Sequence, residues 1–116
     1  MFGREKDDFE NARIPIENMD AKVLYLASED DQSIISDIMG LRMAERMNKY
    51  GRGDQIEVII YPKAGHLLEP PHMPHCPSAF HKTYGVVISW GGEPKHHARA
   101  QEDAWLQTLQ FLRKNV

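Results

Sequence analysis

Two polar clusters in this sequence contain the residue types needed for proton transfer. The acidic segment 29–32 (EDDQ) follows the apolar run at residues 23–27 (VLYLA), and His66 comes shortly after the apolar run at residues 56–61 (IEVIIY). A carboxylate beside an imidazole holds the ring in one tautomer and stabilises its charged form, which frees the other ring nitrogen to act as a base. Asp31 and His66 are therefore candidates for a paired acid and base.

The same residues also have an ordinary structural interpretation. An aspartate pair such as Asp30-Asp31 after a strand is typical of a solvated loop or a helix cap. A single histidine after a glycine, as in Gly65-His66, is often structural or exposed. On the residues alone, both interpretations stay open.

The surrounding pattern predicts the elements that would bring the two clusters together. The apolar runs 23–27 and 56–61 indicate buried parallel strands. Between them we expect a helix of about 16 residues with Ser33 as its N-cap. Its apolar stripe, expected to pack in the core, consists of Ile34, Ile35, Ile38, Met39, Met43 and Met47. A strand, helix and strand in this order place the carboxyl ends of both strands at one sheet edge, where functional groups collect.

The rest of the chain predicts a loop and a helix. Residues 62–94 contain six of the seven prolines and four glycines, which favours an irregular loop. Residues 97–114 regain helical spacing, and Pro94 is expected near the first position of that helix. The apolar face of the helix is predicted to comprise Ala98, Trp105, Leu109 and Leu112, and Trp90 and Trp105 are expected in the core or an interface.

Two parallel strands alone make a poor independent sheet, because such strands require cover on both faces and neighbours on both edges. We therefore expect a lead-in segment at residues 1–20 and, at residues 21–116, the end of a larger α/β sheet. The predicted fold class is α/β: the last two parallel strands, a crossover helix, a long Pro-rich loop and a C-terminal helix. The chain is expected to be a fragment or a reduced isoform.

Several other residues invite functional interpretations with less support. Cys76 lies in a Pro-rich loop, so we expect an inert, partly buried thiol and not a nucleophile. Gly91-Gly92 are expected to form a turn, with phosphate binding as a minor alternative. The zinc-type ligands His72, His75, Cys76, His81, His96 and His97 fit no structural zinc spacing, so no metal site is predicted.

Composition excludes several classes of protein. A formal net charge of −3 and a pI near 6.0 give no basic surface, so no nucleic acid partner is expected. No apolar run approaches the roughly 20 residues that cross a bilayer, so no membrane span is predicted. Residues 1–15 lack the apolar region of a secretory signal peptide. One cysteine excludes an internal disulfide and fits a reducing compartment.

Four stretches resemble one family closely: ARIPIENMDAKVLYLASEDDQ, RMNKYGRG, IIYPKAGHLLEPPHMPHCP and WGGEPKHHARAQEDAWLQTLQFLRKN. The sequence looks like the C-terminal part of the acyl-CoA thioesterase and bile acid-CoA:amino acid N-acyltransferase family, which has an α/β-hydrolase fold. The resemblance covers residues 12 to 115. It implies that Asp31 is the acid of a catalytic triad, with Asp30 as the alternative, and that His66 is its histidine.

The sequence departs from the family pattern in three respects. Ser28 stands where a glycine is usual, and Ile34-Ile35 stand where a tryptophan is common. No G-x-S-x-G or G-x-C-x-G elbow is present for the nucleophile. The resemblance therefore implies a segment that supplies the triad Asp and His but not the serine or cysteine, and we expect it to be inactive by itself.

The function expected from the resemblance is that of a C-terminal segment of a fatty acyl-CoA thioester hydrolase. The alternatives are a segment of an acyl-CoA:amino acid N-acyltransferase, or a non-catalytic isoform that acts as an interaction module and self-associates through an exposed strand edge. No cofactor is expected, since coenzyme A is part of the acyl-CoA substrate. The expected location is intracellular, in the cytoplasm, with mitochondria and peroxisomes as alternatives.

Overall fold

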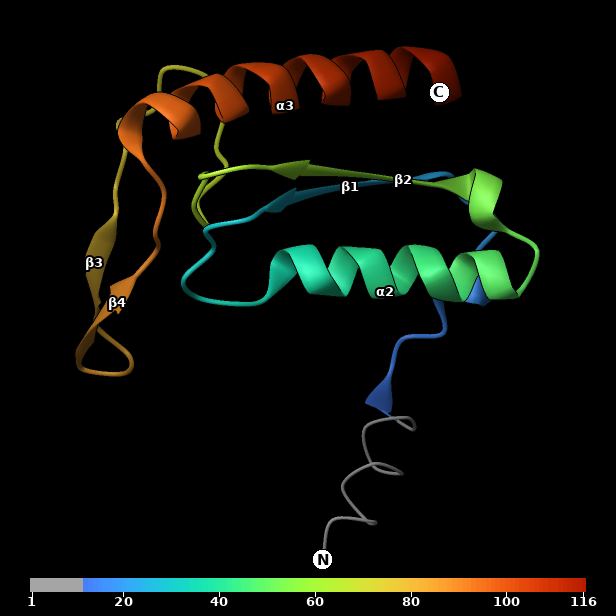
Figure 1. The fold of residues 1–116 in the computed structure, drawn as a ribbon, viewed down its shortest axis with the longest axis horizontal. Helices are drawn as coiled ribbons and strands as arrows, with labels where there is room; N and C mark the ends of the chain where they lie inside the picture. Colours follow the sequence, from blue (N-terminus) through green and yellow to red (C-terminus); the bar gives the residue numbers. More distant parts are fainter. Residues whose placement is uncertain (1–11) are drawn as a thin grey trace, which may run out of the picture.

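A computed structural model describes residues 12–116, and its centre is a small parallel sheet covered by a helix on each face (Figure 1). Strand β1 (Val23–Ser28) pairs in parallel with β2 (Ile56–Tyr61). Helix α2 (Ser36–Lys49) connects the two strands and covers one face of the sheet, and α3 (Pro94–Asn115) covers the other. The predicted order of strand, helix and parallel strand is confirmed.

Three shorter features complete the described chain. The 3-10 helix η1 (Ile16–Asn18) precedes β1, and a second one, η2 (Gly53–Gln55), leads into β2. Strands β3 (Ser78–His81) and β4 (Val86–Ser89) form a separate antiparallel hairpin at one end of the molecule (Figure 1). The architecture of residues 12–116 is therefore mixed α/β, with one parallel and one antiparallel pair of strands.

The hairpin corrects the prediction that residues 62–94 form only an irregular loop. Strands β3 and β4 have four residues each, and the prolines before them masked the strand pattern. Their side chains are mostly exposed, so the pairing does not depend on a buried apolar run of the kind that identified β1 and β2.

The start of α2 also differs from the prediction. Ser33 is not the N-cap, because the Asp31 carboxylate accepts hydrogen bonds from the backbone N–H groups of Ser33 and Ile34 and turns the chain before the helix. The helix therefore begins at Ser36. Of its predicted apolar stripe, Met47 is fully buried, whereas Ile34, Ile35, Ile38 and Met39 are exposed.

Helix α3 packs on the sheet through a different face from the one predicted. It begins with Pro94 in its first turn, as expected. Its buried residues are His97, Ala100, Gln101 and Ala104, and the alanines pack with Tyr61 and Ala64 in the core. The face with Trp105, Leu109 and Leu112 is exposed, because small side chains allow the helix to lie close to the strands and the larger ones point away.

Of the predicted lead-in segment 1–20, residues 1–11 lie outside the described part, and the domain boundary at residue 21 stays a prediction. Its described end is tied to α2: Arg46 donates two hydrogen bonds to the Glu17 carboxylate, at 2.6 and 2.7 Å. No helix within residues 12–116 is both long enough and apolar enough to cross a membrane.

The Glu17–Arg46 pair predicts a specific acid sensitivity. The hydrogen bond from Arg46 is the largest cause that lowers the pKa of Glu17 from 4.5 to about 2. Because the folded pKa is depressed, the pair stabilises the fold above pH 4.5, and this contribution is lost as the pH falls toward 2. We expect urea unfolding at a series of pH values to show that Glu17→Gln lowers the free energy of unfolding at neutral pH, with a difference that shrinks across this window.

Asp20→Asn provides the control, because Asp20 is an almost fully exposed carboxylate whose two contacts with Arg52 are long, at 3.4 Å each. It should show no comparable change with pH. A difference between the native chain and Glu17→Gln that stays constant from neutral pH down to pH 2 would contradict this account.

Candidate active site

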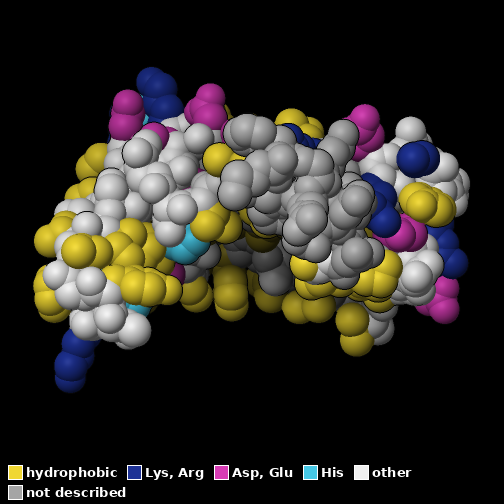
Figure 2. All heavy atoms as spheres, turned by 90° about the horizontal axis from the view of Figure 1, so that it is seen from below, with side chains coloured by type: hydrophobic (Ala, Val, Ile, Leu, Met, Phe, Trp, Pro, Cys, Tyr) yellow, Lys and Arg dark blue, Asp and Glu magenta, His cyan; other side chains and the backbone are white. Residues whose placement is uncertain are grey.

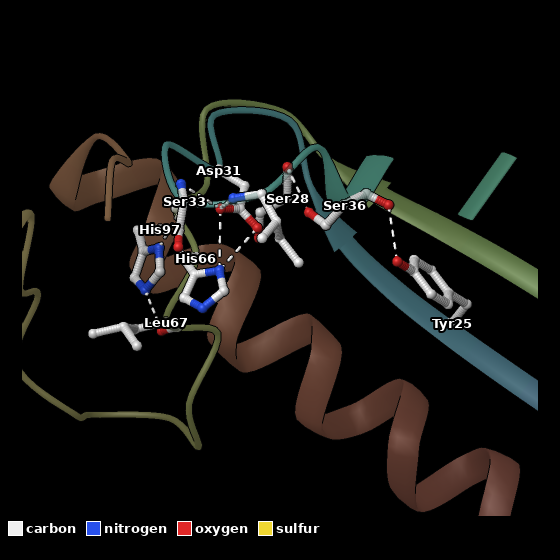
Figure 3. A network of polar contacts seen from close by, with 10 residues as sticks. Tyr25, Ser28, Asp31, Ser33, Ser36, His66, Leu67 and His97 are labelled. Atoms are coloured by element: carbon white, nitrogen blue, oxygen red, sulfur yellow. Dashed lines mark hydrogen bonds and ion pairs between the residues drawn. The ribbon is translucent and has the colours of Figure 1, made fainter. Parts of the chain in front are cut away.

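The candidate acid and base meet at the carboxyl ends of β1 and β2. The strand register places Ser28 opposite Tyr61, so the loops that follow the two strands begin side by side. His66 Nδ1 lies 3.1 Å from Asp31 Oδ1 and 3.0 Å from Oδ2. Figure 3 shows the two side chains pointing toward one another. The structure thus brings together the two residues that the sequence singled out.

Asp30, the alternative acid, faces a different partner. Its Oδ2 accepts a hydrogen bond from the backbone N–H of Gly92 at 2.7 Å, and its Oδ1 accepts one from Gln32 at 2.6 Å. The Asp30 carboxylate therefore ties the loop after β1 to the turn before α3. The geometry assigns the histidine contact to Asp31.

The surroundings of Asp31 keep its carboxylate ionised. The side chain is only 4% exposed, and this burial by itself would raise the pKa. Hydrogen bonds from the Ile34 N–H, the His66 ring and the Ser33 N–H outweigh the burial, so the pKa of Asp31 lies below its ordinary value. An ionised carboxylate only accepts hydrogen bonds, which requires His66 Nδ1 to carry the proton and leaves Nε2 free to accept one.

Backbone hydrogen bonds join the two loops that present the pair. The N–H of Glu29 donates to the Tyr61 carbonyl at 3.0 Å, and the N–H of Asp30 donates to the Ala64 carbonyl at 2.9 Å. On the other side, the Ser36 hydroxyl donates to the Ser28 carbonyl at 3.3 Å, so the first residue of α2 is tied to the end of β1 (Figure 3). The Asp31 loop is held at both ends.

The Trp90 side chain stacks on the His66 ring, a contact that the sequence analysis missed. The indole and imidazole rings stack with their centroids 5.3 Å apart and an angle of 19° between their planes. The backbone N–H of His66 also donates to the Trp90 carbonyl at 2.8 Å. The WGGEP motif was the available signal, but nothing in its spacing links it to residue 66.

Two glycines allow the three loops to pack this closely. A Cβ at Gly65 would collide with the backbone of Trp90 and Gly91, and a Cβ at Gly91 would collide with the Asp30 carbonyl. Gly91 also has a φ of 75°, which disfavours residues with a side chain. The minor alternative of phosphate binding at Gly91-Gly92 loses support, because the Gly92 N–H is already donated to Asp30.

The remaining histidines and the cysteine do not join the pair. The Cys76 thiol donates to the Ser78 carbonyl at 3.3 Å, next to the hairpin. Within residues 12–116, no group of three His, Cys, Asp or Glu side chains has an arrangement that would hold a metal ion. His75 instead places its Nε2 3.1 Å from the Gly92 carbonyl.

A hollow lies beside Asp31, at the start of α2. Its volume is about 410 Å³. Its lining includes both polar and apolar side chains, and consists of Asp31, Gln32, Ser33, Ile34, Ile35 and Met39. Exposed apolar side chains just before α2 and in its first turns therefore border the candidate site.

Comparison with known proteins identifies the family. A family model described as "BAAT / Acyl-CoA thioester hydrolase C terminal" matches residues 2–116. Acyl-coenzyme A thioesterase 1 of Mus musculus is 39% identical over 103 residues, which cover 89% of this chain and 24% of that protein. Peroxisomal succinyl-coenzyme A thioesterase of Mus musculus is 38% identical over the same shares of each chain.

Acyl-coenzyme A thioesterase 2, mitochondrial, of Homo sapiens is also 38% identical, over 89% of this chain and 21% of its own length. The chain thus spans less than a quarter of the length of these relatives. The match to the family model nevertheless extends over nearly the whole chain. The chain therefore belongs to the C-terminal domain family of BAAT and the acyl-CoA thioester hydrolases.

Proposed function

We propose that this chain is the C-terminal segment of an acyl-CoA thioester hydrolase and contributes the acid and the base of its catalytic triad. The observation that carries the proposal is the hydrogen bond between the buried Asp31 carboxylate and His66 Nδ1 at the carboxyl ends of two parallel strands. In open α/β sheets, catalytic groups gather at this edge. The chain order of acid before histidine also matches that of α/β-hydrolases.

In the proposed reaction, His66 transfers the protons and Asp31 orients it. A serine or cysteine elsewhere in the complete enzyme loses its proton to His66 Nε2 and attacks the thioester carbonyl. The imidazolium ion that forms is stabilised by Asp31 and then protonates the departing CoA thiolate. His66 next takes a proton from water, the resulting hydroxide cleaves the acyl-enzyme, and the nucleophile regains its proton.

The hollow beside Asp31 supports a substrate with a hydrocarbon part. Ile34, Ile35 and Met39 present apolar surface next to the proposed triad residue. Burying such surface against an acyl chain contributes about 0.8 kcal/mol for each methylene group. We propose that a fatty acyl chain contacts this end of α2, and that water is the acceptor. An amino acid amine is the alternative acceptor, as in the acyltransferases of the family.

A second candidate function, as an interaction module, is supported by the exposed apolar surface. Figure 2 shows hydrophobic side chains gathered over the hairpin end of the molecule. The exposed residues there are Phe80, Tyr84, Val86 and Val87, and those on α3 are Trp105, Leu106, Leu109 and Leu112. Within residues 12–116, β1 has a partner strand on one edge only. Apolar faces and an open strand edge favour association with a further part of a hydrolase domain or with a second copy.

The names of the relatives bear on the location of this protein in the cell. Relatives named as peroxisomal and as mitochondrial are among those that match. We propose an intracellular location, with the cytoplasm as the first compartment to examine.

The triad proposal predicts a large loss of activity on changing either residue. In the longest natural protein that contains this sequence, we expect His66→Ala or Asp31→Asn to reduce kcat for long-chain acyl-CoA by roughly 10³- to 10⁴-fold. Release of free CoA thiol provides the assay. Asp54→Asn is the matched control, because Asp54 is exposed at the opposite end of the strands, and activity should be retained. Full activity in folded His66→Ala would refute the proposed role.

The 116-residue chain by itself is expected to release no CoA above the uncatalysed rate. It contains no nucleophile elbow, so the acid and base lack the step that they assist. The same thiol assay with the purified chain tests this prediction. Hydrolysis that His66→Ala abolishes would show that the chain supplies its own nucleophile, and Cys76→Ala would then be examined first.

The exposed apolar faces predict association of the isolated chain. We expect light scattering to show a mass that rises from 13.3 kDa with increasing concentration. Leu106→Lys together with Leu109→Lys should reduce the association, because both residues lie on the exposed face of α3. A folded chain that remains strictly monomeric at high concentration would contradict the interaction hypothesis.

A further inference from the structure

A second histidine is buried behind the loop that carries His66. His97 lies in the first turn of α3 and is only 2% exposed. Its backbone N–H donates to the Glu93 carbonyl at 2.8 Å, so the residue is fixed by the helix. The sequence analysis considered it only as a metal ligand, and the reaction proposed above does not use it.

Both ring nitrogens of His97 bind the backbone of the two residues that flank His66. The N–H of Gly65 donates to His97 Nδ1 at 3.0 Å. His97 Nε2 lies 2.9 Å from the Leu67 carbonyl, a contact visible in Figure 3. An N–H only donates and a carbonyl only accepts, so Nδ1 is unprotonated and Nε2 carries the proton. The two bonds select one neutral tautomer.

The segment held in this way has no regular secondary structure of its own. Residues 62–77 lie between β2 and β3 and include His66, whose ring must stay within 3.1 Å of Asp31. The Trp90 carbonyl binds the backbone N–H of His66 itself, at 2.8 Å. Three consecutive residues are thus held by α3 and by the segment that precedes it.

The environment of His97 favours the neutral ring that both bonds require. Burial is the largest cause that lowers the pKa of His97 below its ordinary value, and the nearby His75, with ring centroids 4.8 Å apart, acts in the same direction. The hydrogen bond to Leu67 and the charge of Glu69 oppose the shift without reversing it. A proton on Nδ1 would break the bond from Gly65.

We propose that His97 is a positioning residue, whose neutral ring clamps the backbone on both sides of His66 and so holds the His66 imidazole against Asp31. The catalytic part of this inference rests on the function proposed above, and its structural part does not. A misplacement of about 1 Å at a reacting group costs on the order of 10²-fold in rate. The expected role therefore concerns kcat more than substrate binding.

The first measurement is the tautomer of His97 in the 116-residue chain, by long-range proton–nitrogen correlation NMR on protein labelled with ¹⁵N-histidine. At neutral pH we expect a protonated Nε2 and an unprotonated Nδ1 for His97, with the opposite pattern for His66. A His97 ring protonated at Nδ1, or at both nitrogens, would overturn the proposal without any variant.

The second measurement compares variants of His97. His97→Phe keeps a buried ring but removes both hydrogen bonds, so the His66 ring signals should shift and lose the single-tautomer pattern. In the longest natural protein, kcat should fall about 10- to 100-fold with little change in KM. His97→Gln carries both a donor and an acceptor and should recover part of this loss. A folded His97→Phe with unchanged His66 signals and unchanged kcat would overturn the proposal.

His96→Gln is the control, since His96 is the adjacent and partly exposed histidine of the same helical turn. It should leave the His66 signals in place. If His97→Phe does not fold, the tautomer of the native chain and the response to His97→Gln decide the question. A longer protein without hydrolase activity, in which the NMR results are as expected, would reject the proposed function and support the clamp.

Discussion

The parallel pairing of β1 with β2 is the constraint on which the rest of the site depends. Its register sets Ser28 opposite Tyr61, so the loops that leave the two strands start next to each other and exchange backbone hydrogen bonds. A shift of one residue would move every side chain of a strand to the opposite face of the sheet. Such a shift would also separate Asp31 from His66. The register of β1 and β2 therefore determines both which side chains face the helices and whether Asp31 meets His66.

At this edge, the two buried residues Asp31 and His97 have partners of the opposite hydrogen-bonding type. Asp31 is ionised and surrounded by donors, whereas His97 is neutral and lies between one donor and one acceptor. Such pairing is required because a buried polar group without a partner costs about 1–3 kcal/mol. It also gives each residue a single protonation state. A proton-transfer site requires this, because the geometry of His66 depends on which nitrogen carries the proton.

The packing of the two helices is consistent with the family assignment. Each helix approaches the sheet through a face that includes small residues, such as Gly40 on α2 and Ala100 on α3, and leaves large apolar side chains exposed. Exposed apolar area on this scale marks surfaces that associate. The relatives are roughly four times as long as the matched segment, since it covers 24% of their length. In the proposed enzyme, these faces contact the remainder of the hydrolase domain.

The sequence by itself determined the βαβ order, the two strands and the helical start at Pro94, because apolar runs and a proline at the first helical position act locally. It also singled out Asp31 and His66, through their places after the strands and through the family motifs. Only the tertiary structure decided that Asp31, and not Asp30, faces the histidine, and that Trp90 and His97 hold the loop in place. These contacts join residues 24 to 35 positions apart, and their geometry depends on how three loops pack, which no local pattern records.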